Sequence, residues 1–213
     1  MNSNFQENFI LNQQTIITIS GNLGSGKSTV GERIAKRLSL RVFGTGDLMR
    51  EVAQRYNMTI NEFNEYVNEH PEIDEIIDEE ILTLAQTEKN LLLVSRLAWF
   101  FIPDSFKVYL YVKEDEGARR IFKDTKRNSE KYKNYHETLQ ATYTRFENSR
   151  LRFIRTYGVD ITEKKHYDLY LDTTAMSVQE VENVIIDAYH HYLENKRKGK
   201  GYDKTICSYQ NKN

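Results

Sequence analysis

The segment that decides the fold is Thr15-Ile-Ile-Thr-Ile-Ser-Gly-Asn-Leu-Gly-Ser-Gly-Lys-Ser28. Its first six residues are mostly β-branched, which predicts a strand over 15–20 that ends at Gly21. A helix is predicted directly after Lys27 because apolar residues then recur at helical spacing, namely Val30, Ile34, Ala35 and Leu38. A strand, a glycine-rich turn and a helix therefore follow one another without a break.

The turn over residues 21–28 matches the pattern G-x-x-x-x-G-K-[ST] in full, between a strand and a helix as that motif requires. Glycines allow successive backbone N–H groups to point at a phosphate, and the helix N-terminus adds partial positive charge. The pattern predicts that ATP binds here, with Lys27 on its phosphates and the Ser28 hydroxyl on Mg²⁺. The predicted ATP-binding residues are Gly21, Asn22, Leu23, Gly24, Ser25, Gly26, Lys27, Ser28 and Thr29.

Strands and helices alternate along the rest of the chain. Further strands are predicted over 41–43, 91–94, 107–112 and 167–172. The intervening helices are predicted over 47–56, 59–70, 73–84, 114–126, 136–157 and 177–193, two of them opened by the capping boxes Thr59–Glu62 and Ser177–Glu180. This alternation predicts a three-layer α/β fold with a five-stranded, mainly parallel sheet.

The composition restricts the class of protein. The chain has 213 residues, 39% of them hydrophobic, and a net charge of −1, which argues against a uniformly basic nucleic-acid binder. A single cysteine, Cys207, excludes an intramolecular disulfide. No apolar run is long enough for a membrane span, and residues 1–14 lack the pattern of a secretory signal, so we expect a cytoplasmic protein. We expect one domain over 1–195 and a mobile polar tail over 196–213.

The charges are segregated along the chain. Residues 47–90 hold 12 acidic and 3 basic residues, whereas residues 119–155 hold 11 basic and 4 acidic ones. Two solvated helix faces would explain this pattern, and so would two segments of opposite charge that have different functions.

Two arginines follow predicted strands. In an open parallel sheet the loops at the carboxyl ends of the strands line the ligand crevice. Thr45 and Asp47 are placed to cap the helix after the second strand, and Arg50 lies one turn further on. Arg96 follows the buried 91–94 strand, where a charge is costly unless an anion is near. The alternative is a surface Arg50 and an Arg96 paired with an acid.

With these segments in order, the chain resembles the nucleoside monophosphate (NMP) kinases, and more narrowly the archaeal-type cytidylate kinases and their bacterial relatives. The resemblance covers residues 15–190. It rests on the phosphate loop and on the segments 45–50, 58–74, 95–99, 145–161 and 167–173.

The resemblance implies a core, an NMP-binding segment over 47–90 and a lid over 120–155. It implies that Thr45, Asp47, Arg50 and Arg96 bind the acceptor nucleotide. The implied catalytic residues are Lys27, Arg96, Arg120, Arg145 and Arg152, whereas Arg127 and Arg150 match the family pattern less well. Arginines suit this reaction because phosphoryl transfer depends on positioning and on stabilising charge over the phosphoryl oxygens.

The implied activity is phosphoryl transfer from ATP, with Mg²⁺, to a nucleoside monophosphate, CMP or dCMP first. The implied partners are these small molecules, with no membrane and no nucleic acid, and the protein would be a monomer or homodimer. Three alternatives stay open: a kinase for a metabolite hydroxyl, a nucleotide-binding regulatory module with weak or lost catalysis, and a nucleic-acid-binding role that rests only on the basic stretch and the tail.

One position departs from the family pattern. An acidic residue that helps to orient the water shell of Mg²⁺ usually ends the central strand, and here that position is Val94. Base-reading residues are expected between 45 and 99, with Asn61, Asn64 and Asp74 as candidates. Trp99 is a candidate either for stacking on the base or for the core.

Overall fold

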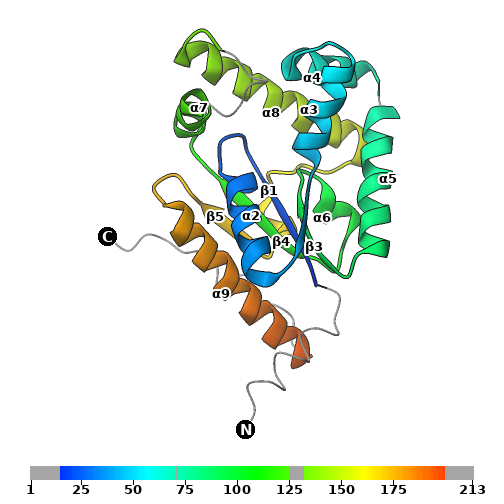
Figure 1. Cartoon of the computed structure of the whole chain (residues 1–213), viewed down its shortest axis with the longest axis vertical. Helices are drawn as coiled ribbons and strands as arrows, with labels where there is room; N and C mark the ends of the chain where they lie inside the picture. Colours follow the sequence, from blue (N-terminus) through cyan, green and yellow to red (C-terminus); the bar gives the residue numbers. More distant parts are fainter. Residues whose placement is uncertain (1–14, 71, 125–131, 200–213) are drawn as a thin grey trace.

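The computed structural model describes residues 15–70, 72–124 and 132–199 (Figure 1). Five parallel strands form one sheet in the order β2-β3-β1-β4-β5, which confirms the predicted sheet. The strands are β1 (Thr15–Gly21), β2 (Arg41–Gly44), β3 (Asn90–Val94), β4 (Phe106–Tyr111) and β5 (Leu169–Asp172).

Helices follow most of the strands. The α-helices are α2 (Lys27–Leu38), α3 (Thr45–Arg55), α4 (Ile60–Glu69), α5 (Glu72–Thr87), α6 (Ala98–Phe101), α7 (Glu114–Lys123), α8 (Tyr135–Tyr157) and α9 (Val178–Arg197). A short 3-10 helix, η1 (Lys164–His166), precedes β5. No helix within the described ranges is long and apolar enough to cross a membrane.

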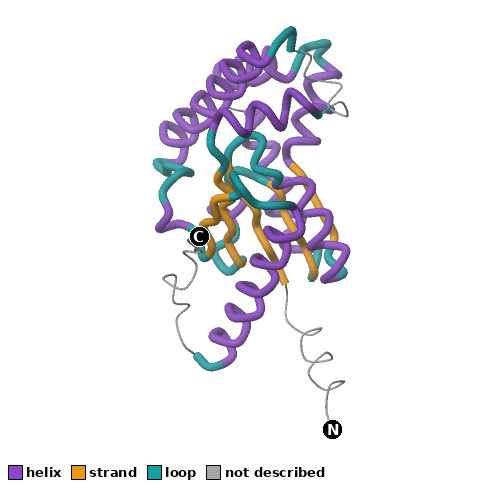
Figure 2. The backbone as a smooth tube through the Cα atoms, turned by 90° about the vertical axis from the view of Figure 1, so that its left-hand side faces the viewer, coloured by secondary structure: helices purple, strands orange, loops and turns teal. Residues whose placement is uncertain are grey.

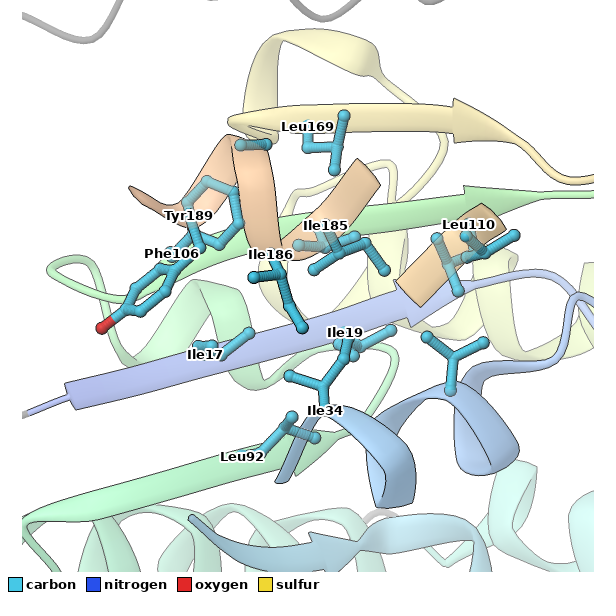
Figure 3. Packing of buried hydrophobic residues seen from close by; sticks show 14 of the residues in the cluster. Ile17, Ile19, Ile34, Leu92, Phe106, Leu110, Leu169, Ile185, Ile186 and Tyr189 are labelled. Atoms are coloured by element: carbon cyan, nitrogen blue, oxygen red, sulfur yellow. The ribbon is translucent and has the colours of Figure 1, made fainter. Parts of the chain in front are cut away.

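Helices cover both faces of the sheet and so produce the three predicted layers. On one face α2 and α9 pack against β1, with Ile34, Ile185 and Ile186 meeting Ile17 and Ile19 (Figure 3). On the other face α5 and α6 cover β3, where Leu91 and Leu93 are fully buried. Each such side chain contributes about 1.5–3 kcal/mol of burial free energy.

The remaining helices gather beyond the carboxyl ends of the strands (Figures 1 and 2). There α8 spans from α7 on one side to α4 on the other, and it packs on both. This arrangement places α8 over the edge of the sheet where β1 and β3 end.

The buried face of α8 differs from the predicted one. Apolar spacing predicts an inward face of Leu139, Tyr143, Phe146, Phe153 and Tyr157, but Tyr143 is exposed and only Phe153 of this set is buried. The other buried residues of α8 are polar, namely Thr138, Thr142, Arg145, Ser149 and Arg152. The hydroxyls of Thr138, Thr142 and Ser149 bond to carbonyls one turn earlier, so these three side chains are buried with their hydrogen bonds made.

The predicted ends of the helices are largely confirmed. The capping boxes at Thr59 and Ser177 are both formed, and Gly158 ends α8 in a left-handed conformation with φ of 69°. Gly44, however, is the N-cap of α3, so the expectation that Thr45 and Asp47 cap this helix is wrong. Helix α6 was not predicted, because four residues are too few to show a period.

Some expectations concern residues that the structure does not describe. Helix α9 runs through Arg197, so the first residues of the expected tail are helical. The rest of that tail from residue 200, including Cys207, lies outside the described residues, as do Arg127 and residues 1–14.

Candidate active site

The phosphate loop joins β1 to α2 and is held in a defined shape. Gly24 and Gly26 have φ of 77° and 88°, which side-chain-bearing residues rarely adopt. The Asn22 side chain donates to the Val112 carbonyl at 2.6 Å and accepts from the Val112 N–H at 2.9 Å, which ties the loop to the chain just after β4. The Lys27 Nζ donates to the Asn22 carbonyl at 2.6 Å, so its ammonium lies against the loop.

Helix α7 rests directly on this loop. A Cβ on Gly24 would lie 2.3 Å from the Gly117 carbonyl oxygen, and a Cβ on Gly117 would lie 2.6 Å from that of Leu23. Only glycine fits at such a close backbone approach. The helix that leads into the expected lid over 120–155 is thus in contact with the predicted ATP-binding residues.

On the β5 side of the loop lies one hollow, the donor-side hollow. It is lined by Gly24, Gly26 and Thr29 together with Arg120, Thr173 and Met176. Arg120 donates to the Thr173 and Thr174 carbonyls at 2.8 and 3.0 Å and to Glu116 at 3.1 Å. Sequence reasoning missed residues 173–178 as part of a site, although they follow β5 at the sheet edge where ligands bind.

On the β3 side of the loop lies a second cavity, the acceptor pocket, bounded by α2, α3, α4, α5, α8 and the end of β3. It brings together most of the residues predicted for phosphate and substrate binding. These are Lys27, Ser28, Thr45, Asp47, Arg50, Arg96, Arg145 and Arg152. Arg120 is the exception among the predicted catalytic residues, because it lines the donor-side hollow.

Arg96 lies at the centre of the positive charge in the acceptor pocket. Its guanidinium donates to the Ser149 hydroxyl of α8. Burial, followed by the charges of Arg145 and Arg152, lowers the pKa of Arg96 to about 9, so the side chain is still cationic at neutral pH. An anion among these arginines would relieve their mutual repulsion.

Arg152 lines the same pocket, but its donors are engaged within the protein. It pairs with Asp74 of α5 at 2.7 Å and donates to Asn68 of α4 at 3.0 Å. Its side chain is only 4% exposed. Arg152 therefore links α8 to the acidic helices, whereas Arg150 lies away from the pocket and pairs with Asp160 and Glu147.

Near the mouth of the pocket Arg50 pairs with Asp47, three residues earlier on α3. The Asp47 side chain is 75% exposed and that of Arg50 is 29% exposed. Exposed pairs of this kind contribute little stability, so Arg50 can exchange Asp47 for a phosphate at low cost.

Val94 occupies the position at which the family pattern has an acidic residue. Val94 ends β3, is 7% exposed and lines the acceptor pocket together with Ser28. A Cβ on Gly31 would lie 2.9 Å from a Val94 methyl group, so Val94 also closes the packing of α2 on β3. Within the described residues no group of three or more His, Cys, Asp or Glu side chains could hold a metal ion. The exposed Ser28 hydroxyl fits Mg²⁺ only with phosphate oxygens and water as further ligands.

The structure separates the base-reading candidates. Asn64 and Asp74 line the acceptor pocket, whereas Asn61 does not and is within 3.5 Å of the Tyr132 hydroxyl. Trp99 is 5% exposed and packs with Tyr109 and Tyr167, so its role is in the core. Sequence reasoning missed Asp78, which lines the pocket one turn beyond Asp74.

Comparison with known proteins shows which family the chain is related to. The profile of the cytidylate kinase-like family matches residues 16–175. The chain belongs to the cytidylate kinase-like family. It is 32% identical over 173 residues to a cytidylate kinase of Archaeoglobus fulgidus, which covers 81% of this chain and 93% of that protein. It is 33% identical over 180 residues to a cytidylate kinase of Sulfurisphaera tokodaii, covering 84% of this chain and 96% of that protein.

A further similar protein is named for a different reaction. An S-adenosylmethionine-dependent nucleotide dehydratase of Lacinutrix mariniflava is 37% identical over 177 residues, which is 83% of this chain. The match spans only 36% of the length of that protein.

Solved structures support the fold alone. An uncharacterised protein from Eubacterium ventriosum superposes with a TM-score of 0.59 and 17% identity, covering 82% of this chain and 97% of that one. A shikimate kinase from Acinetobacter baumannii superposes with a TM-score of 0.55 and 17% identity, covering 88% and 98%. The fold and the membership of the cytidylate kinase-like family together support nucleotide kinase activity.

Proposed function

We propose that this protein transfers the γ-phosphoryl group of ATP to a nucleoside monophosphate, CMP or dCMP, and releases ADP and the nucleoside diphosphate. The observation that carries the proposal is the arginine-lined acceptor pocket, which shares Gly24, Gly26 and Thr29 with the donor-side hollow. Two nucleotides bound in these cavities would meet at the phosphate loop. The names of the relatives agree on the substrate class, because cytidylate kinases and a nucleotide dehydratase all act on nucleotides.

In the proposed reaction an oxygen of the acceptor phosphate attacks the γ-phosphorus, and the bond from that phosphorus to the β,γ-bridging oxygen breaks. Lys27 would contact the transferring group, while Arg96 and Arg145 would hold the acceptor phosphate from the opposite side. Their fixed charges stabilise the negative charge that is spread over the phosphoryl oxygens in the transition state. No general base is needed, since a phosphate oxygen is already ionised at neutral pH.

The remaining predicted residues take supporting roles. Arg120 would face the donor nucleotide, and Arg50, Thr45 and Asp47 would line the entry of the acceptor. Mg²⁺ would neutralise the donor phosphates, with the Ser28 hydroxyl as its ligand from the protein. We further propose a single kinase domain over 1–195, with 47–90 as the NMP-binding segment and 120–155 as a lid that excludes water.

Val94 favours a second candidate function. With no acid at the end of β3, the protein would bind both nucleotides and transfer phosphate slowly, as a regulatory module. A kinase for a metabolite hydroxyl is less well supported, because four arginines line the acceptor pocket and a hydroxyl acceptor has no phosphate for them.

A substrate panel tests these alternatives. The protein is incubated with ATP and Mg²⁺ against CMP, dCMP, UMP, AMP, GMP and several hydroxyl metabolites, and both products are measured. Formation of CDP or dCDP with equal amounts of ADP supports the proposal. Binding of ATP and CMP without transfer supports the regulatory module, and transfer to an acceptor without a phosphate contradicts the assignment as an NMP kinase.

A further inference from the structure

The wall of the acceptor pocket that α4 and α5 provide differs chemically from the rest of the pocket. The phosphate loop, the segment after β3 and helix α8 supply Lys27, Arg96 and Arg145, whereas this wall supplies Asn64, Asp74 and Asp78. A nucleotide whose phosphate lies among the cations must place its base away from them. The α4–α5 wall, which also offers the apolar side chains of Ile60 and Ile77, is where the base would lie.

The hydrogen bonds within this wall differ between its three polar side chains, and they leave one carboxylate oxygen for a ligand. Both carboxylate oxygens of Asp74 accept from Arg152, so Asp74 is already used. The Asn64 Nδ2 donates to the Ile60 carbonyl at 2.6 Å, which holds the amide in place and leaves Oδ1 and the second N–H of Nδ2 for other partners. One oxygen of Asp78 accepts from the Tyr157 hydroxyl, and within the described residues nothing donates to the other.

We propose that Asp78, oriented by Tyr157, selects nucleotides whose base carries an exocyclic amino group, and so favours CMP over UMP. This inference rests on the proposed function and names the residue that determines its specificity. A carboxylate accepts a hydrogen bond from the cytosine amino group, whereas uracil presents a carbonyl oxygen at the same ring position. That oxygen facing Asp78 would put two acceptors together, which costs binding energy because neither can donate.

The surroundings of Asp78 support this role. It is half-buried, and burial raises its pKa to about 6, with Asp74 and Glu75 of α5 adding to the rise. From α8, the Tyr157 hydroxyl bond opposes this rise in pKa, and Arg152, which lines the same pocket, is paired with Asp74. At neutral pH Asp78 is therefore an ionised acceptor that is held partly out of water and that, among the described residues, has no cation paired with it. Such a carboxylate would be stabilised by a ligand group that donates a hydrogen bond to it.

The test compares D78N with the matched control E79Q. Both change one carboxylate of α5 into an amide, but Glu79 is exposed and does not line the pocket. An amide can donate to the uracil oxygen as well as accept from the cytosine amino group. In D78N we expect the ratio of kcat/KM for CMP to that for UMP to fall by about 10-fold or more. In E79Q it should stay within about twofold of the unchanged protein.

Two further measurements keep the outcome clear. The dissociation constants of CMP and UMP are measured by calorimetry on the same variants, with folding checked by circular dichroism. In Y157F the carboxylate remains but loses its orienting bond, so we expect a smaller fall in the CMP to UMP ratio.

The possible failures are distinct. If no monophosphate is phosphorylated but CMP binds more tightly than UMP and D78N removes the difference, the proposed function fails and the role of Asp78 stands. If CMP is phosphorylated and folded D78N keeps the CMP to UMP ratio of the unchanged protein, the role of Asp78 is overturned and the proposed function stands.

Discussion

Arg152 of α8 holds Asp74 of α5 by two hydrogen bonds, from Nε to Oδ2 at 2.7 Å and from a terminal nitrogen to Oδ1 at 3.3 Å. Both side chains are almost completely buried. The pair joins the helix that carries the basic segment of the chain to the helices that carry the acidic one. The basic and the acidic segments of the sequence are therefore in direct contact in the wall of the acceptor pocket.

Removing one partner of this pair should destabilise the fold. R152M leaves the Asp74 carboxylate buried and unpaired, for which we expect a loss of about 3–5 kcal/mol in the free energy of unfolding. Urea denaturation of the purified variant measures this loss. In the double variant R152M/D74N the lone charge is gone, so part of the stability should return. A single variant as stable as the parent would show that the pair is not structural.

Arg96 should affect the acceptor and not the donor. In R96M we expect kcat/KM for CMP to fall by about 10²–10³-fold, because one fixed cation is lost from the acceptor phosphate. The KM for ATP should change little. R119A is the matched control, since Arg119 pairs with Glu116 on the outside of α7. Equal losses in both variants would indicate a general effect of charge.

The sequence predicted the parts of the site that follow from a motif or from the ends of strands. The phosphate loop, the five strands and both capping boxes depend on local residue order, and Arg50 and Arg96 depend on their place after β2 and β3. Asp78 could not be found in this way, because one acid among 12 in residues 47–90 carries no local signal. Its role depends on Tyr157, which is 79 residues away in the chain.

The inward face of α8 shows a second limit of sequence reasoning. Apolar periodicity assumes that a helix buries its apolar side, but α8 faces a polar pocket and buries Thr138, Thr142 and Ser149 around its arginines. The signal that was present is the spacing of these small hydroxyl residues with Arg145 and Arg152, on one helical stripe.

Val94→Asp should raise the rate of phosphoryl transfer. The new carboxylate would lie at the end of β3 near Ser28, where it can orient the water shell of Mg²⁺. We expect a higher kcat and a lower Mg²⁺ concentration for half-maximal rate, together with some loss of stability because Val94 is buried against Gly31. Val94→Asn is the matched control without the charge. Equal or lower turnover in folded Val94→Asp would count against a missing metal-shell acid.

Asp78 should make stability depend on pH. Its folded pKa of about 6 lies above the value of about 3.9 in an unfolded chain. A raised pKa means that the folded state binds the proton more tightly, so this stabilising contribution is complete below about pH 4 and is lost as the pH rises through 6. The D78N variant has no ionisable group at position 78. Relative to the parent, its free energy of unfolding should therefore increase between pH 4 and 7. A difference that is constant over this range would place the pKa of Asp78 near its ordinary value.

The most direct measurement follows the phosphoryl group itself. Purified protein is mixed with γ-labelled ATP, Mg²⁺ and CMP, and the label is followed into CDP, orthophosphate and remaining ATP, with K27A as the comparison. The account predicts label in CDP, little in orthophosphate, and no transfer by K27A although it remains folded. Label released only as orthophosphate, or transfer that K27A retains, would contradict it.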